Sequence, residues 1–436
     1  MSDSKLRAWG IFPNIAVGLQ LVLLSAIFLL PLTGYASEEP LAVGRVKVGA
    51  ERLLVDHRAL VAGKRVGIIT NHSAVVGDQH LIDLLAADPE VTIAALFGPE
   101  HGLRGTADAG EAVAHSVDEQ TGAPVYSLYG QTRRPTEEML ADVDVLLFDM
   151  QDVGTRFYTY PATMGRSMIS AAEAGIPFVV LDRPNPLGGE RMEGTIREEQ
   201  FRSGIGLYPT PVTHGMTIGE LARMIQGEGW HDGLEDLELH VVEIEGWDRS
   251  MLWTETGLEW VPPSPNIPDV ETAFIYPGTC FFEGTTASEG RGTYQPFLQI
   301  GDVGIDSAAV VRELTGRGLS GLEFEAVYFV PESIPGMSKN PKLLGEKVSG
   351  VRLKVTDPKE LAPVAVGMHL LDVFYHALPE DRREDFFNER GIHIRAGSEE
   401  TKALIEAGGD VRKLIDGWEK DLQSFSQRRE AYLLYN

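Results

Sequence analysis

Four apolar segments in the first half of the chain each end in a cluster of polar residues. The segments are 66–69, 94–97, 145–148 and 178–181, and the clusters that follow them are 70–73, 98–102, 149–156 and 182–186. Buried strands of parallel sheets are continuous apolar runs. Open α/β sheets bind ligands at the carboxyl ends of their strands. The four clusters therefore predict a single site at one edge of a parallel sheet.

Strand-like and helix-like segments alternate over residues 45–262. Predicted helices cover 80–85, 136–141, 163–174 and 217–227. The last of these begins with Thr217 and has Glu220 three residues later, which is the spacing of a capping box. Alternation of this kind predicts an α/β fold, with a parallel sheet covered by helices.

The second half of the chain has a different pattern. Prolines crowd residues 261–268, where they exclude regular structure, and a glycine-rich polar stretch follows at 283–293. Strand-like segments at 327–330 and 351–355 then precede helical ones at 363–377 and 410–432. We predict a second, smaller α+β domain over residues 263–436.

The amino terminus predicts export from the cytoplasm. Lys5 and Arg7 precede an apolar run at 15–32, and small residues at 34–36 form a cleavage site, so residues 1–36 are predicted to be a signal peptide. The run is also long enough to act as an uncleaved anchor. The single cysteine, Cys280, excludes a disulfide within the chain. We expect a periplasmic or secreted protein, without stable membrane association once the signal is cleaved.

Composition and missing motifs narrow the function. A formal charge of -26 disfavours nucleic acid as a partner, because nucleic acid binding needs basic patches. No G-x-G-x-x-G follows the first strand, which disfavours a dinucleotide, and no G-x-S-x-G is present, which disfavours a serine nucleophile. We predict no cofactor and no metal ion.

Three acidic residues at the predicted edge suit glycoside hydrolysis. Glu100 follows the second apolar segment, where an apolar surrounding raises a carboxyl pKa as a general acid requires. Asp149 and Asp152 flank one turn and offer a second carboxylate. A metal-dependent hydrolase using His72, His101, Asp149 and Asp182 is the alternative from another enzyme class, although the spacings of these residues match no metal motif.

Arginine and aromatic residues in the same clusters suit a sugar acid. Arg291 lies between two glycines that permit close backbone approach, and its planar guanidinium matches a ligand carboxylate. Arg156 is a second candidate for that contact, or a structural partner of an aspartate. Tyr158 is expected either in the core or as a stacking wall for a sugar ring.

Several of these clusters together resemble one known family, the bacterial exo-β-N-acetylmuramidases, long catalogued as a domain of unknown function. The matching motifs are TNH at 70–72, FGPEHG at 97–102, FDMQDVGTRFYTY at 148–160, LDRPNP at 181–186, HGMT at 214–217, PSPN at 263–266, SEGRGT at 288–293 and YLLY at 432–435. The resemblance covers residues 45–436, which is nearly the whole chain after the predicted signal peptide.

The resemblance implies a Rossmann-like catalytic domain over 45–262 and a C-terminal domain that contributes loops to the cleft. It implies release of N-acetylmuramic acid from the non-reducing end of peptidoglycan fragments, with muropeptides or disaccharides as substrates. Glu100 matches the family's glutamate suspected of catalysis. Asp152 or Asp149 is our choice for its partner from position alone. A non-catalytic sugar-binding module is a further alternative.

The remaining predictions concern contacts with the substrate. The residues predicted to bind it are Asn71, His72, His101, Arg156, Tyr158, Asp182, Arg183, His214, Glu289 and Arg291. Of these, Arg156 or Arg291 is expected to pair with the lactyl carboxylate of muramic acid, a group that most other sugars lack.

Overall fold

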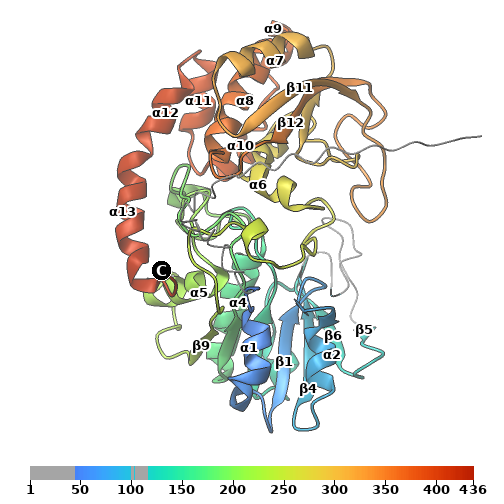
Figure 1. Cartoon of the computed structure of the whole chain (residues 1–436), viewed down its shortest axis with the longest axis vertical. Helices are drawn as coiled ribbons and strands as arrows, with labels where there is room; N and C mark the ends of the chain where they lie inside the picture. Colours follow the sequence, from blue (N-terminus) through green and yellow to red (C-terminus); the bar gives the residue numbers. More distant parts are fainter. Residues whose placement is uncertain (1–44, 100–102, 104–115) are drawn as a thin grey trace, which may run out of the picture. The chain divides into compact units, whose positions relative to one another are not determined.

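A computed structural model of the chain describes residues 45–99, 103 and 116–436 (Figure 1). The predicted signal peptide, Glu100 and His101 lie outside these residues. Within the described part of the chain, no helix is long and apolar enough to cross a membrane.

A seven-stranded sheet forms the N-terminal part, and its strand order is β5-β6-β4-β1-β7-β8-β9. All neighbouring strands pair in parallel except β5 and β6 at one edge. The strands are β1 (Arg65–Thr70), β4 (Thr92–Gly98), β5 (Ser116–Val117), β6 (Pro124–Ser127), β7 (Val145–Asp149), β8 (Phe178–Leu181) and β9 (Leu239–Val242). The predicted fold class is therefore confirmed for this part.

Both faces of this sheet are buried, which explains the continuous apolar runs. Successive side chains of a strand point to opposite faces. In β7, Phe148 belongs to the larger hydrophobic core, and its neighbour Leu147 belongs to the core on the other face. Ile69 and Ile68 of β1 divide in the same way. A short antiparallel pair, β2 (Val75–Val76) and β3 (Gln79–His80), follows β1.

Helices connect and cover the strands, as the alternating pattern predicted. They are α1 (Gly49–Val55), α2 (Leu81–Ala86), α3 (Glu137–Leu140), α4 (Tyr160–Ala174) and α5 (Ile218–Gly227). Thr217 and Glu220 form the predicted capping box at the start of α5. Helix α4 begins at Tyr160, three residues earlier than predicted, because Pro161 fits the first turn of a helix, where a missing N–H costs nothing.

The C-terminal part contains a three-stranded antiparallel sheet with the order β10-β12-β11. Its strands are β10 (Gln299–Asp302), β11 (Leu322–Phe329) and β12 (Val348–Val355). The helices are α6 (Val270–Thr279), α7 (Ser307–Gly316), α8 (Pro363–Ala377), α9 (Glu380–Arg383), α10 (Glu389–Ala396), α11 (Glu400–Glu406), α12 (Val411–Gly417) and α13 (Glu419–Arg429). This arrangement confirms the predicted α+β class. The helix predicted over 410–432 is divided at Trp418 into α12 and α13.

The order of the strands places the polar clusters at a switch point of the sheet. After β1, the chain builds β4 and β6 on one side of it, and then returns to build β7 and β8 on the other. Connections that leave in opposite directions open a crevice at the carboxyl ends of the strands. The residues that follow β1, β7 and β8 therefore meet at one edge.

Two glycines allow α6 and α8 to cross at close range. A Cβ built on Gly278 of α6 falls 1.9 Å from the carbonyl oxygen of Pro363 and 3.0 Å from the nitrogen of Gly367. Both obstacles are backbone, so they cannot move aside as a flexible side chain does. We predict that Gly278→Ala lowers the free energy of unfolding by about 3 kcal/mol in urea denaturation.

Gly316, at the end of α7, is the matched control, because a Cβ there meets nothing within 4 Å. Gly316→Ala should leave the free energy of unfolding within about 1 kcal/mol of the wild-type value. Equal losses in the two variants would contradict the close crossing.

Candidate functional site

The side chain of Asn71 organises the carboxyl end of β1. It is fully buried, and its Nδ2 donates to the hydroxyl oxygen of Tyr160 at 2.6 Å. Its Oδ1 accepts hydrogen bonds from the backbone N–H and the hydroxyl of Ser73. The Ser73 hydroxyl oxygen in turn accepts the backbone N–H of Gln151 at 3.0 Å. The ends of β1 and β7 and the start of α4 are thereby fixed to one another.

The proline-rich segment 261–268 lies against this edge. The Tyr160 hydroxyl donates to the carbonyl oxygen of Pro263 at 2.6 Å. The Nε2 of His72 lies 2.6 Å from the carbonyl oxygen of Pro262. Prolines leave carbonyls as the hydrogen-bonding groups of this stretch, so these contacts hold it without regular structure. His72 therefore contacts the protein backbone, which gives this predicted substrate residue a positioning role.

Asp152 is a buried carboxylate that is only partly satisfied. Its Oδ2 accepts the N–H of Gly154 at 2.8 Å, whereas its Oδ1 has no hydrogen-bond partner among the described residues. Burial raises the pKa of Asp152 to about 7, although the backbone N–H groups of Gly154 and Val153 oppose the shift. The group also interacts electrostatically with Tyr158. A carboxyl with a free oxygen and a pKa near 7 suits proton transfer or charge stabilisation.

Asp149 is occupied in a different way. Both of its oxygens accept hydrogen bonds from Arg183, with the Oδ1 2.6 Å from Nε and the Oδ2 3.0 Å from Nη2. Asp149 is fully buried at the end of β7, and Arg183 is 4% exposed. A bidentate pair of this kind gives each carboxylate oxygen one donor and fixes the carboxylate in place. Of the two aspartates predicted for the second catalytic role, Asp152 has an oxygen without a partner among the described residues and Asp149 is held by an arginine, and the role itself stays a prediction.

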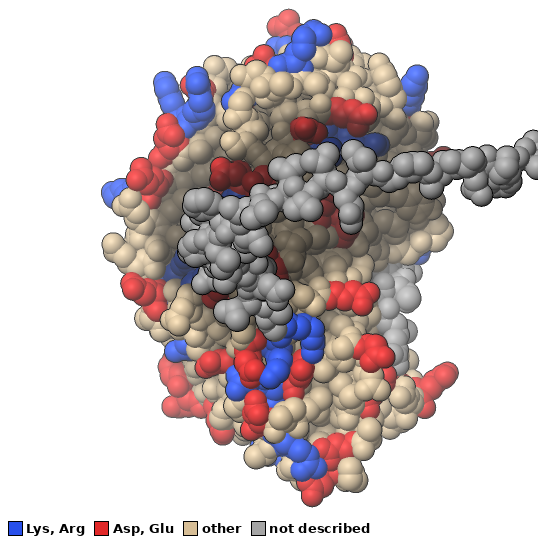
Figure 2. Space-filling model, viewed as in Figure 1, with Lys and Arg blue, Asp and Glu red and all other residues tan. Residues whose placement is uncertain are grey.

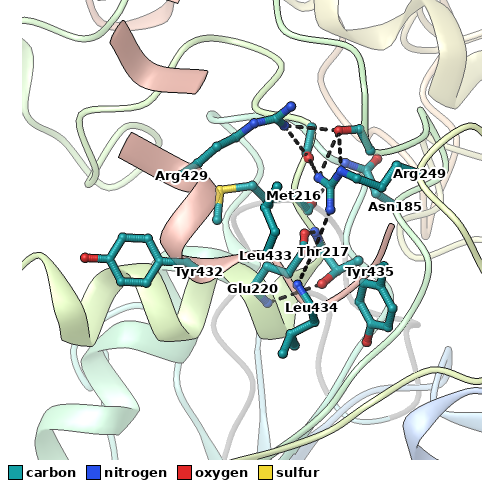
Figure 3. A network of polar contacts seen from close by, with 12 residues as sticks. Asn185, Met216, Thr217, Glu220, Arg249, Arg429, Tyr432, Leu433, Leu434 and Tyr435 are labelled. Atoms are coloured by element: carbon teal, nitrogen blue, oxygen red, sulfur yellow. Dashed lines mark hydrogen bonds and ion pairs between the residues drawn. The ribbon is translucent and has the colours of Figure 1, made fainter. Parts of the chain in front are cut away.

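Asp182, at the end of β8, is tied to the last residues of the described chain. Its carboxylate accepts hydrogen bonds from the hydroxyls of Tyr435 at 2.6 Å and Thr217 at 2.7 Å. Burial raises its pKa to about 7, although these donors oppose the shift. Figure 3 shows the neighbouring contacts, in which Glu220 accepts from Arg249 at 2.6 Å and from the backbone of Leu434. These contacts tie Asp182 to distant parts of the protein, and its predicted contact with substrate stays a prediction.

Arg156 and His214 also turn inward. The guanidinium of Arg156 donates to the carbonyl oxygens of Thr195, Thr210 and Arg395. Burial lowers the pKa of Arg156 to about 9. His214 is 1% exposed, and its Nδ1 accepts the backbone N–H of Met216. Burial lowers the His214 pKa to about 3, so the ring is neutral. The Nε2 of His214 and the Nε of Arg156 are buried without a hydrogen-bond partner among the described residues, and the substrate contacts predicted for both residues stay predictions.

Tyr160, the hydrogen-bond partner of Asn71, lines a cavity of about 320 Å³. Its volume is at the lower end of the range for small-molecule sites, about 300–1,000 Å³. The lining residues are Phe157, Tyr158, Thr159, Tyr160, Ile205, Ser264, Asn266, Ile267, Tyr276, Glu283, Arg291 and Phe297. We call it the aromatic cavity. It combines residues from the start of α4, the proline-rich segment and the C-terminal part.

Asn266 supplies an amide to this cavity. It is 1% exposed, and its Nδ2 donates to the carbonyl oxygen of Met337 at 2.8 Å. Its Oδ1 has no hydrogen-bond partner among the described residues. An unsatisfied buried acceptor favours a ligand that brings an N–H or O–H donor. Asn266 stands in the PSPN motif but was not among the predicted site residues.

Arg291 reaches the aromatic cavity from a cluster of charges. It donates to Glu283 at 2.7 Å, and its guanidinium lies 5.1 Å from the ring centre of Phe297. Glu283 also pairs with Arg395. The two arginines lower the pKa of Glu283 to about 2, although burial opposes this shift. Glu289 lies 2.9 Å from Lys342. Three cations therefore face two carboxylates, which leaves one positive charge in excess.

The predicted site residues separate into four groups. Tyr158 and Arg291 line the aromatic cavity, and Glu289 belongs to the cluster behind it. Asp152 keeps an oxygen without a partner among the described residues. Hydrogen bonds within the protein hold Asn71, His72, Asp149, Arg156, Asp182, Arg183 and His214. Glu100 and His101 lie outside the described residues. Glu283 and Asn266 were not among the predicted residues, although they lie in the glycine-rich and proline-rich stretches.

On the face shown in Figure 2, surface charges of both signs are mixed, and the potential metal ligands of the described residues do not cluster. Basic side chains lie among acidic ones over the face shown in Figure 2, and a hollow crosses the middle of that face. Among the described residues, no group of three or more His, Cys, Asp and Glu is arranged to hold a metal ion. The set proposed for a metal-dependent hydrolase includes His101, which lies outside them.

Comparisons with known proteins cover nearly all of the described chain. Residues 66–271 match the family model for the N-terminal part of the exo-beta-N-acetylmuramidase NamZ, and residues 274–435 match the model for its C-terminal part. The chain is 45% identical over 392 residues to the peptidoglycan beta-N-acetylmuramidase NamZ of Bacillus subtilis (strain 168). That match covers 90% of this chain and 92% of the relative.

Two crystal structures of DUF1343 family proteins from Bacteroides fragilis NCTC 9343 are also similar. One has a TM-score of 0.82 at 34% identity, and the other has a TM-score of 0.75 at 33% identity. Each match covers 90% of this chain and 99% of the other.

The burial of Asp152 predicts a pH-dependent cost in stability. Its folded pKa, about 7, lies above the ordinary 3.8, so the folded protein binds more protons between these pH values. The free energy of unfolding contributed by this group therefore falls as pH rises from about 4 to 7. We predict that Asp152→Asn unfolds in urea with roughly 1–3 kcal/mol more free energy than wild type at pH 8, and with no such gain at pH 4.

Asp144 is the matched control with the opposite sign. Hydrogen bonds from Arg65 lower the pKa of this partly exposed carboxylate. Asp144→Asn should therefore lose stability at pH 8 and approach wild type at low pH. A gain for both variants at pH 8 would show that burial of Asp152 is not the cause.

Proposed function

Since this chain belongs to the exo-beta-N-acetylmuramidase NamZ family, we propose that it is an exo-acting glycoside hydrolase that releases N-acetylmuramic acid from the non-reducing end of peptidoglycan fragments. The observation that carries the proposal is the 45% identity to a peptidoglycan beta-N-acetylmuramidase over 90% of the chain. The substrates are peptidoglycan-derived disaccharides or muropeptides.

The aromatic cavity is suited to this sugar. Tyrosine and phenylalanine side chains line it and suit contact with a pyranose ring, and the Oδ1 of Asn266, which has no partner among the described residues, suits a hydrogen bond from a hydroxyl or an acetamido N–H. Muramic acid differs from most sugars by a lactyl carboxylate. The excess positive charge around Arg291 compensates that carboxylate, which is costly to bury alone.

Asp152 is the second catalytic carboxylate in this proposal. Glu100 would protonate the glycosidic oxygen, a role that rests on its family motif because it lies outside the described residues. The free Oδ1 of Asp152 would stabilise the positive charge at the anomeric carbon, attack that carbon or take a proton from water. Each of these roles needs the ionised carboxylate. With a pKa of about 7, this form is lost as the pH falls.

A direct test incubates the protein with the disaccharide of N-acetylmuramic acid and N-acetylglucosamine, with muramic acid at the non-reducing end. Free N-acetylmuramic acid, detected by NMR during turnover, supports the proposal. Intact disaccharide at high enzyme concentration contradicts it. Repeating the reaction in excess chelator separates this mechanism from a metal-dependent hydrolase.

The role of Asp152 predicts a specific pH profile. On an aryl N-acetyl-β-muramide, wild-type kcat should fall as the pH drops below about 7, because the carboxylate becomes protonated. Asp152→Asn should lower kcat by about 10²–10⁴-fold and remove this dependence. Unchanged kcat in a folded variant would exclude Asp152 from the chemistry.

Arg291 predicts substrate choice. Arg291→Gln removes one cation beside the cavity while Arg395 still pairs with Glu283. We expect kcat/KM for the aryl muramide to fall by about 100-fold, and that for the aryl N-acetylglucosaminide to change little, because only the muramide carries a carboxylate. Arg412→Gln, at an exposed arginine paired with Asp410, is the control. Equal losses on both substrates would contradict a contact with the lactyl group.

The location is a separate proposal. The basic, apolar and small residues at 1–36 support export by a signal peptide, and therefore a periplasmic or secreted enzyme. Mass spectrometry of the protein from fractionated cells tests this. A mature amino terminus after Ala36 in the exported fraction supports it, and intact Met1 in the cytoplasm contradicts it.

A further inference from the structure

A second cavity, also of about 320 Å³, lies at the same edge of the seven-stranded sheet. Ser73, Gln151 and Arg183, which follow β1, β7 and β8, all line it. It shares no lining residue with the aromatic cavity. No residue that was given a role in the aromatic cavity lines this second cavity. We call it the tryptophan cavity, after Trp253 in its wall.

Gln151 presents an unsatisfied acceptor at this cavity. The residue is 3% exposed. Its Nε2 donates to the carbonyl oxygens of Asp152 at 2.7 Å and Pro184 at 2.9 Å. These two bonds fix which end of the amide is nitrogen, since an oxygen there would face two carbonyls. The Oε1 atom of Gln151 is buried and has no hydrogen-bond partner among the described residues.

Arg183 presents a donor at the same cavity. Its Nε and Nη2 donate to Asp149, and Nη2 also donates to the carbonyl oxygen of Val75 at 3.2 Å. Its Nη1 makes no hydrogen bond to any residue that the structure describes. Because Asp149 already neutralises the guanidinium, the cavity offers a donor without an excess charge. It therefore favours a neutral ligand.

The chemistry of a ligand follows from this pair. An unsatisfied acceptor and an unused donor are both satisfied by a secondary amide, which carries one N–H and one C=O. In the rest of the wall, Trp253 at 5% exposure, Val75 and Leu258 form an apolar part, and Arg45, Ser73 and Glu259 form a polar part. Such a wall suits a methyl group and the face of a sugar ring. An acetamido sugar combines all of these features.

Neighbouring stretches of the chain line the two cavities. Gln151 lines the tryptophan cavity, and the next residue, Asp152, interacts electrostatically with Tyr158 of the aromatic cavity. Val261 lines the one, and Ser264 of the same proline-rich segment lines the other. The proposed catalytic carboxylate therefore lies next in sequence to a residue of the tryptophan cavity and interacts with a residue of the aromatic cavity.

We propose that the tryptophan cavity binds the neutral N-acetylated amino sugar of the fragment that departs when muramic acid is released. This rests on the proposed function for the identity of the fragment, although binding of the sugar itself does not. Gln151 accepts the acetamido N–H, Arg183 donates to the acetamido carbonyl, and Trp253 contacts the ring.

The first experiment measures binding without turnover. The probes are methyl N-acetyl-β-D-glucosaminide and methyl β-D-glucoside, which lacks the acetamido group, titrated into the full-length protein and followed by NMR. Wild type should bind the first and not the second. Leu258→Trp, which fills the cavity, should weaken binding by about tenfold or more, and Leu258→Met, which conserves volume, should change it less than about twofold.

The second experiment measures hydrolysis of two substrates by the same variants. Relative to Leu258→Met, Leu258→Trp should lower kcat/KM for the disaccharide about tenfold more than kcat/KM for an aryl muramide, which has no departing sugar. Equal losses on the two substrates, or no loss on either, would overturn the proposal. So would equal binding of both methyl glycosides by wild type.

The failure of the proposed function has a different signature. If wild type hydrolyses neither the disaccharide nor the aryl muramide, the muramidase proposal fails, while binding of the acetamido probe and its loss in Leu258→Trp still decide the sugar site. If wild type hydrolyses both but does not bind the probe, the sugar site fails alone.

Discussion

The buried side chain of Asn71 is the contact on which the candidate site depends. Through Tyr160 and Ser73 it joins the end of β1 to α4, to the residue after β7 and to the proline-rich segment at Pro263. All of these groups are buried, so each hydrogen bond lost would leave an unsatisfied polar atom in the interior. Without these hydrogen bonds, the residues that line the two cavities would lose this connection.

The same edge keeps one carboxylate poorly satisfied. Asp149 and Asp182 lie at comparable depth, but Arg183 neutralises the first and hydroxyl donors surround the second. Asp152 has one free oxygen and no cationic partner among the described residues. Its raised pKa is therefore a local cost in stability that the surrounding hydrogen-bonded network sustains, as is common where a group is reserved for chemistry.

The sequence patterns predicted the sheet well because burial on both faces leaves a direct signature in each strand. They also predicted, for the same reason, which residues meet at the carboxyl edge of the sheet. They could not predict how the surroundings of Asp152 differ from those of Asp149, or those of Arg291 from those of Arg156, because each difference depends on which oxygen or nitrogen a distant residue occupies. Arg156 bonds to the carbonyl of Arg395, and Asp182 bonds to Tyr435, at separations of more than 200 residues that no local pattern encodes.

The adjacency of Gln151 and Asp152 has a consequence for catalysis. Gln151 lines the tryptophan cavity, its Nε2 donates to the backbone carbonyl of Asp152, and its Oε1 has no partner among the described residues. A sugar that satisfies Oε1 would make the amide less free to move, and the carboxylate beside it would be held more firmly. Occupation of one cavity would then favour the geometry needed at the other. Binding energy from the departing sugar would in this way contribute to the rate of bond cleavage and not only to affinity.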